Sequence, residues 1–191
     1  MHILVRFFSL FIFLLVGMPA VFCQEYQVEG VRHGLRIGGT FAELRNTAGE
    51  EYLPNSLDTY YFGYIRESRF LPFMRFGAGL EFYQLGGRDG SREQVKLSYL
   101  AIPLMLKVKI GPFFAMGGYQ GAIRVHAVEI RGNIRTDPEE GKYSRWNAGP
   151  YVGAGAQFLI FFIEGRYTWG KEGIVDNFNA RQWQLGGGII F

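Results

Sequence analysis

The chain has 191 residues, of which 48% are hydrophobic, 17% are aromatic and 27 are glycine, and its formal net charge at pH 7 is +3. So small a cationic excess, with no basic cluster or base-stacking motif, argues against nucleic acid binding. The length fits one domain, and abundant glycine together with abundant tyrosine and phenylalanine favours a β-barrel over a helical domain.

The N-terminal segment has the pattern of a secretory signal. Arg6 precedes an apolar run over residues 7–16, and the pattern predicts cleavage between Cys23 and Gln24. The run is shorter than the ~20 residues that a membrane-spanning helix needs. An uncleaved anchor helix and a lipoprotein modified at Cys23 stay open as alternatives. Removal of residues 1–23 leaves a mature domain of residues 24–191 without cysteine and therefore without disulfides.

The rest of the chain predicts eight strands and no helix. Apolar residues recur at every second position over strand-length segments, which is the period of a β-strand. The strands are expected at residues 31–44, 57–66, 70–85, a hairpin over 99–128 that turns at Gly111 and Pro112, and then 143–158, 161–169 and 181–191. Short turns are expected at 67–69, at 111–112 and near Leu159, and polar loops at 45–56, 86–94, 131–142 and 170–180.

The hairpin shows the two faces best. Its first strand carries Leu100, Ile102 and Leu104 on an unbroken aliphatic face, while Met105 and Lys107 lie on the mixed face. Strands of a soluble sandwich also alternate, so this pattern alone does not identify the solvent. The connections alternate strictly between long and short, as in outer-membrane barrels with short periplasmic turns, whereas Greek-key crossovers would break the alternation. The fold predicted is an all-β, eight-stranded antiparallel up-and-down transmembrane β-barrel.

Three segments carry a family resemblance. The strings YLAIPLMLKVKIG at residues 99–111, IEGRYTWG at 163–170 and WQLGGGIIF at 183–191 resemble the PorT-like outer-membrane β-barrel family of Bacteroidota-type proteins. The resemblance covers residues 31–191. It implies an eight-stranded barrel and, for some relatives, a link to type IX protein secretion. It also implies that Phe191 belongs to the C-terminal signal read by the barrel-insertion machinery.

Charged residues on the mixed faces are the candidate site. Those expected to face the lumen are Arg36, Arg75, Glu81, Lys107, Arg124, Glu164 and Arg166. Buried charges must be paired, so the main interpretation is an ion-pair network that plugs the barrel. A path for small anions is the alternative.

One histidine is the only candidate for chemistry. His126 is expected on the lumenal face near the outer rim, with Glu129 and Asp137 close in sequence, and histidine is the usual proton shuttle. No positioned nucleophile accompanies it, and no His/Asp/Glu spacing resembles a metal ligand set. No catalytic residue, metal or cofactor is therefore assigned.

The remaining aromatic residues point to the membrane. Tyr64, Trp146, Tyr167, Trp169 and Trp183 lie toward strand ends on the outward face, as in an aromatic girdle. The sequence thus predicts an exported, non-enzymatic, monomeric outer-membrane barrel with a filled lumen, which acts as a structural or assembly component through its external loops. The expected partners are outer-membrane lipid, the barrel-insertion machinery and an envelope or secretion protein. A narrow anion pore and a rim enzyme using His126 are the alternatives.

Overall fold

The structure is a computed structural model that describes residues 30–46, 55–89, 93–132, 134–136, 138, 143–170 and 178–191. The predicted signal peptide and its cleavage between Cys23 and Gln24 lie outside these residues. The described residues form nine strands: β1 (Val31–Asn46), β2 (Asn55–Leu71), β3 (Met74–Asp89), β4 (Glu93–Ile110), β5 (Phe113–Arg131), β6 (Ile134–Thr136), β7 (Trp146–Phe158), β8 (Phe161–Trp169) and β9 (Phe178–Ile190). In this described part, no helix is long and apolar enough to cross a membrane.

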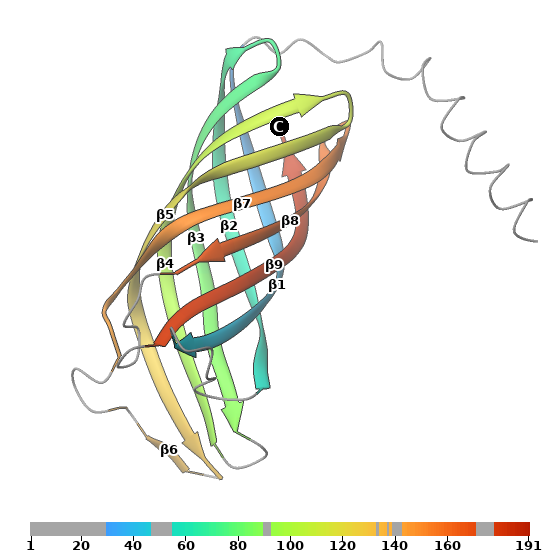
Figure 1. The fold of residues 1–191 in the computed structure, drawn as a ribbon. Coiled ribbons are helices and arrows are strands. Elements are labelled where there is room, and N and C mark those ends of the chain that lie inside the picture. Colours follow the sequence, from blue (N-terminus) through green and yellow to red (C-terminus); the bar gives the residue numbers. More distant parts are fainter. Residues whose placement is uncertain are drawn as a thin grey trace, which may run out of the picture.

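Eight strands close into an antiparallel barrel (Figure 1). The sheet runs β4-β3-β2-β1-β9-β8-β7-β5-β6, and pairing of β4 with β5 closes it. Every pair is antiparallel, and β1 joins β9, so the first and last barrel strands are neighbours. The short β6 pairs only with the end of β5 and lies outside the closed wall. The fold class predicted from the sequence is confirmed.

The barrel buries its polar face and exposes its apolar face. On β4, Ile102 is 58% exposed on the outer wall, whereas Met105 is 4% exposed and Lys107 1% exposed inside. The same inversion recurs around the barrel, because exposed positions are mostly Leu, Ile, Phe, Val and Trp. A closed wall has no free edge, and its exterior presents apolar side chains to its surroundings.

One end of the barrel, called the turn end, holds three short turns and the C-terminus (Figure 1). The turns lie at residues 72–73, 111–112 and 159–160. The turn predicted at 67–69 was wrong, because β2 continues to Leu71 and residue Glu67 faces inward. An inward charge with a buried partner can continue a strand, so charge alone does not mark a turn.

The opposite end, called the loop end, extends further than expected. Strands β2 to β5 are 16 to 19 residues long, against ~9–11 residues for a bilayer span. Most of the loop predicted at 86–94 is strand, because Gly86 to Asp89 pair with Lys96 to Glu93. The loop predicted at 131–142 contains β6, while the strand predicted to start at Tyr143 begins at Trp146.

Glycines on two strands make room for the bulky Tyr61 ring against the inner face of the barrel wall. A Cβ on Gly38 would lie 2.6 Å from a ring carbon of Tyr61 and 2.2 Å from the carbonyl oxygen of Leu185. A Cβ on Gly186 would lie 2.4 Å from the Tyr61 hydroxyl. Two neighbouring strands therefore lack side chains where the Tyr61 ring lies, and the Tyr61 hydroxyl comes within 3.5 Å of Glu164 on β8.

Candidate functional site

A cluster of charged side chains fills the middle of the lumen. The carboxylate of Glu81, on β3, is fully buried. Its Oε2 lies 2.7 Å from Nη2 of Arg36, on β1, and 2.7 Å from Nη2 of Arg166, on β8. Its Oε1 accepts a hydrogen bond of 2.9 Å from Nε2 of Gln184, on β9. Four strands thus meet at one carboxylate.

A second carboxylate completes this central cluster. Oε1 of Glu164 lies 3.5 Å from Nη1 of Arg36 and 3.5 Å from Nε of Arg166, and the hydroxyl of Tyr61 lies 3.5 Å from it as a donor. The Arg166 guanidinium also lies over the Tyr61 ring, 5.2 Å from its centroid. Two arginines and two glutamates balance in charge, as buried ions must. The structure brings together four of the seven predicted lumenal charges here.

Lys107 belongs to a separate pair nearer the turn end. Its ammonium binds the carboxylate of Glu67, and both side chains are 2% exposed. The ammonium also lies 4.6 Å from the centroid of the Phe114 ring and 5.8 Å from that of Phe162. Sequence reasoning missed Glu67 by placing it in a turn, although the alternation Tyr61, Gly63, Ile65, Glu67 continues the inward face without interruption.

Arg75 and Arg124 lie apart from the central cluster. Arg75 is 7% exposed and pairs in register with Lys107, so two cations lie side by side near the turn end. Arg124 is half-buried at the other end, and its Nη1 donates a hydrogen bond of 2.6 Å to the carbonyl oxygen of Tyr143. The seven predicted lumenal charges therefore divide among three levels of the barrel.

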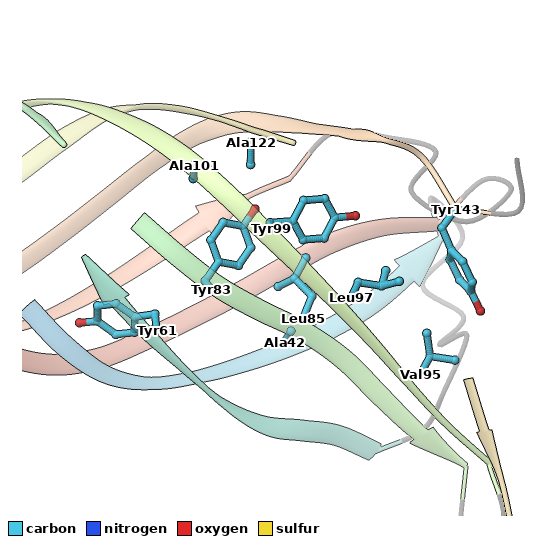
Figure 2. Packing of buried hydrophobic residues seen from close by; sticks show 10 residues of the cluster. All are labelled: Ala42, Tyr61, Tyr83, Leu85, Val95, Leu97, Tyr99, Ala101, Ala122 and Tyr143. Atoms are coloured by element: carbon cyan, nitrogen blue, oxygen red, sulfur yellow. The ribbon is translucent and has the colours of Figure 1, made fainter. Parts of the chain in front are cut away.

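Apolar side chains pack in the lumen on both sides of the central cluster. Toward the loop end, Tyr83 and Tyr99 stack with their centroids 5.5 Å apart and their planes 15° apart. Figure 2 shows these rings with Leu85, Leu97 and Val95 in the same cluster. Toward the turn end, a second cluster consists of Ile65, Met105, Phe114, Met116, Tyr151, Phe162 and Ile190. Two apolar clusters thus flank the central charged cluster, and the Lys107–Glu67 pair lies among side chains of the one nearer the turn end.

The prediction that His126 faces the lumen was wrong. On β5, Ser98 pairs with His126 and Tyr99 pairs with Arg124, so Val125 is an extra residue in the ladder. A β-bulge of this kind reverses the faces beyond it. His126 is consequently exposed, while Glu129 is buried and accepts a hydrogen bond of 2.7 Å from the Tyr143 hydroxyl.

The residues predicted for the girdle lie on the outer wall. Trp146, Trp169 and Trp183 are 62%, 40% and 55% exposed, and Tyr167 contacts two of them with ring centroids 4.7 Å apart. Tyr64 lies at the other end of the barrel, stacked on His33. Phe191 is 65% exposed, and its backbone exchanges two hydrogen bonds with that of His33.

The charged side chains at the middle of the lumen are paired and buried. Every charge of the central cluster contacts an opposite charge, and none of these side chains has the exposure that a substrate contact requires. Within the described ranges, no group of three or more His, Cys, Asp or Glu residues could hold a metal ion.

Two solved bacterial structures share the architecture. Ail, the attachment invasion locus protein of Yersinia pestis, is 16% identical, with 86% of this chain and 100% of that chain covered at a TM-score of 0.51. Neisserial surface protein A is 13% identical, with 83% and 95% covered at a TM-score of 0.56. At these identities the likeness shows the fold alone. No curated protein matches the chain.

A family model agrees with the barrel architecture. The model described as outer membrane protein beta-barrel domain matches residues 22–189, which is most of the chain. The protein described here therefore belongs to the outer membrane protein beta-barrel domain family.

Proposed function

We propose that this outer-membrane barrel is a sealed, non-enzymatic scaffold that acts through the part of it that projects from the membrane. The observation that carries the proposal is the filled lumen. Two arginines and two glutamates join β1, β3 and β8 across its middle, between two apolar clusters. A small eight-stranded barrel has an interior just wide enough for its side chains, so such a filling leaves no continuous path.

The projecting wall supports an interaction role. A bilayer span takes ~9–11 residues per strand, and β4 and β5 have 18 and 19. The excess at the loop end forms a sheet outside the membrane, to which β6 adds exposed residues such as Ile134, which is 69% exposed. A partner at the outer surface, belonging to an assembly system, would bind there. The PorT-like resemblance adds protein secretion as the process to examine first.

Conductance separates the scaffold from the anion pore. In planar bilayers the purified barrel should show no steady current. A steady anion-selective conductance that falls in Arg124→Ala would replace the scaffold by the pore, because Arg124 is the half-buried cation toward the loop end. Heat-modifiable gel mobility of Arg124→Ala is the control, because it shows whether the variant still folds into a barrel.

Site-specific photo-crosslinking tests the interaction surface. A photoreactive residue in place of Arg135, exposed on β6, should crosslink in native membranes to one protein of the envelope. The same residue in place of Ile163, on the outward wall of β8, should crosslink to none. Equal patterns from the two positions would contradict a dedicated external surface.

His126 does not support an enzyme. It lies on the outer face beyond the bulge, opposite Ser98, rather than beside the buried Glu129. We expect His126→Ala to leave the barrel's phenotype unchanged. A lost phenotype with normal folding would restore the rim-enzyme hypothesis.

A further inference from the structure

Two of the turns at the turn end have no polar side chain, and their large apolar side chains are exposed. In the turn 110–113, Ile110 is 77% exposed and Phe113 63%. In the turn 158–161, Leu159 is 84%, Ile160 50% and Phe161 61% exposed. Turns in water normally carry Gly, Pro, Asn, Asp or Ser. Gly111 and Pro112 fit that rule, but Ile110, Phe113 and all of residues 158–161 do not. Large apolar side chains at these positions indicate that the turns are not in water.

The backbone at Leu159 strengthens this argument. Leu159 has a φ of 54°, and it is the one described non-glycine residue with a positive φ. A leucine in the left-handed region is unfavourable, whereas asparagine or glycine would fit it. The position thus combines a strained backbone with an exposed aliphatic side chain. Strain that persists at one place suggests that the side chain has a role there.

The backbone of these turns is suited to hydrocarbon. The Pro112 carbonyl oxygen accepts a hydrogen bond of 2.7 Å from the Gln157 amide, and the Ile160 carbonyl accepts one of 2.7 Å from the Ile190 amide. The Leu159 carbonyl accepts a bond of 3.0 Å from the Gln157 side chain. Backbone polar groups in lipid must be bonded within the protein, because no water reaches them.

The length of β8 places the second turn in the bilayer. This strand has nine residues. At a rise of ~3.3 Å and a tilt of ~40°, nine residues span about 23 Å along the membrane normal. The apolar band of such barrels is ~25 Å tall. With Trp169 in the outer girdle, Phe161 and the turn after Phe158 still lie inside that band.

The third turn, at residues 72–73, has exposed apolar side chains as well, since Phe70 is 71%, Leu71 41% and Phe73 53% exposed. Two basic side chains precede it on β2. Arg66 and Arg69, near the end of β2, are both exposed, and the one acid described beside them, Glu67, is buried against Lys107. Exposed arginines next to an apolar surface suit phosphate groups, which the planar guanidinium binds with two hydrogen bonds.

We propose that the turn end is seated in the inner leaflet of the outer membrane, with turns 110–113 and 158–161 among the acyl chains and with Arg66 and Arg69 on the phosphate groups of anionic phospholipid. The apolar turns match the acyl chains of a phospholipid, and the two arginines match its phosphate group. A periplasmic protein would instead need an apolar pocket for each turn. The seat depends on the barrel being in a membrane and not on the scaffold role proposed above.

Tryptophan quenching measures the depth of the turn. In lipid nanodiscs, with the three native tryptophans changed to phenylalanine, Ile160→Trp should lose most of its emission to acyl-brominated phosphatidylcholine and little to iodide. Ile134→Trp, on β6, is the matched control and should show the reverse. Heat-modifiable gel mobility verifies that each variant folds. Quenching of Ile160→Trp by iodide alone would overturn the proposal and indicate a water-facing protein docking surface.

A lipid competition tests the arginines. Wild-type barrel purified from mixed nanodiscs of phosphatidylglycerol and phosphatidylcholine should retain phosphatidylglycerol above its bulk fraction. Arg66→Gln with Arg69→Gln should return the retained fraction to the bulk value. The control pair Arg135→Gln and Arg145→Gln, exposed at the loop end, should keep the enrichment. Equal enrichment in wild type and in the Arg66/Arg69 variant would remove the headgroup contact from the proposal.

Discussion

Glu81 and Arg166 meet across the full width of the barrel, with 2.7 Å between the carboxylate Oε2 and the guanidinium Nη2. Glu81 is on β3 and Arg166 on β8, and β2, β1 and β9 separate these strands along the wall. In an eight-stranded barrel that separation is half the circumference. One hydrogen bond therefore ties together opposite sides of the wall, a contact that backbone pairing between neighbours does not provide.

Removal of the Glu81 charge should destabilise the barrel severely. In Glu81→Gln, Arg36 and Arg166 keep only Glu164 as an anion, and the cluster carries an uncompensated buried positive charge. Breaking a buried pair costs about 3–5 kcal/mol. The free energy of unfolding, from urea titration in lipid vesicles, measures the loss. Asp58→Asn, at an exposed position on β2, is the control and should change it by less than about 0.5 kcal/mol.

The Lys107–Glu67 pair should show strong coupling. Lys107→Met keeps an unbranched chain between the Phe114 and Phe162 rings but leaves the Glu67 carboxylate buried without its cation. We expect a loss of about 3–5 kcal/mol in unfolding free energy. Glu67→Gln added to Lys107→Met should recover more than half of that loss, because the buried charge is then gone. Additive losses in the double-mutant cycle would show that the two side chains act independently.

The sequence predicts the barrel well because a closed wall imposes the same two-residue period on every strand. The facing of Ile102 and Met105 follows from that period, and the bounds of β8 agree residue for residue. The predictions that were wrong lie where a bulge interrupts the two-residue period or where charged residues on a strand resemble a turn. An extra residue at Val125 reverses the faces before His126, and nothing in the local sequence distinguishes a bulge from regular strand.

The contents of the lumen are less predictable than its wall. The two-residue period identifies which charged side chains point inward. The contacts among them depend on which strands lie opposite each other, and only the closed barrel determines that. Arg36 and Glu164 meet because β1 and β8 flank β9. Glu67 was missed for a different reason. The polar run at residues 67–69 predicts a turn, whereas Glu67 continues the inward face of β2 and is the partner of Lys107.

Gly38 should not tolerate a methyl group. A Cβ at this position would lie 2.2 Å from the Leu185 carbonyl oxygen and 2.6 Å from both a Tyr61 ring carbon and Gly186 Cα, so backbone as well as side chain must move. Overpacking of this kind costs about 1–3 kcal/mol. Gly121→Ala, on β5, is the matched control because nothing lies within 4 Å of its Cβ. Unfolding in urea compares the two, and equal stabilities would mean that the Tyr61 ring is not held against Gly38.

The two faces of β4 should tolerate polar side chains to different degrees. Ile102 is 58% exposed on the outer wall, so in Ile102→Arg a charge enters the acyl layer, and a charge at the bilayer midplane costs about 2–4 kcal/mol. Met105→Gln keeps the shape of the side chain and places an amide in a lumen that already holds Gln120 and Gln184. We therefore expect the glutamine variant to lose less. Urea unfolding in vesicles of fixed thickness gives both values, and a glutamine variant as damaged as the arginine variant would contradict the assignment of lipid to the Ile102 face.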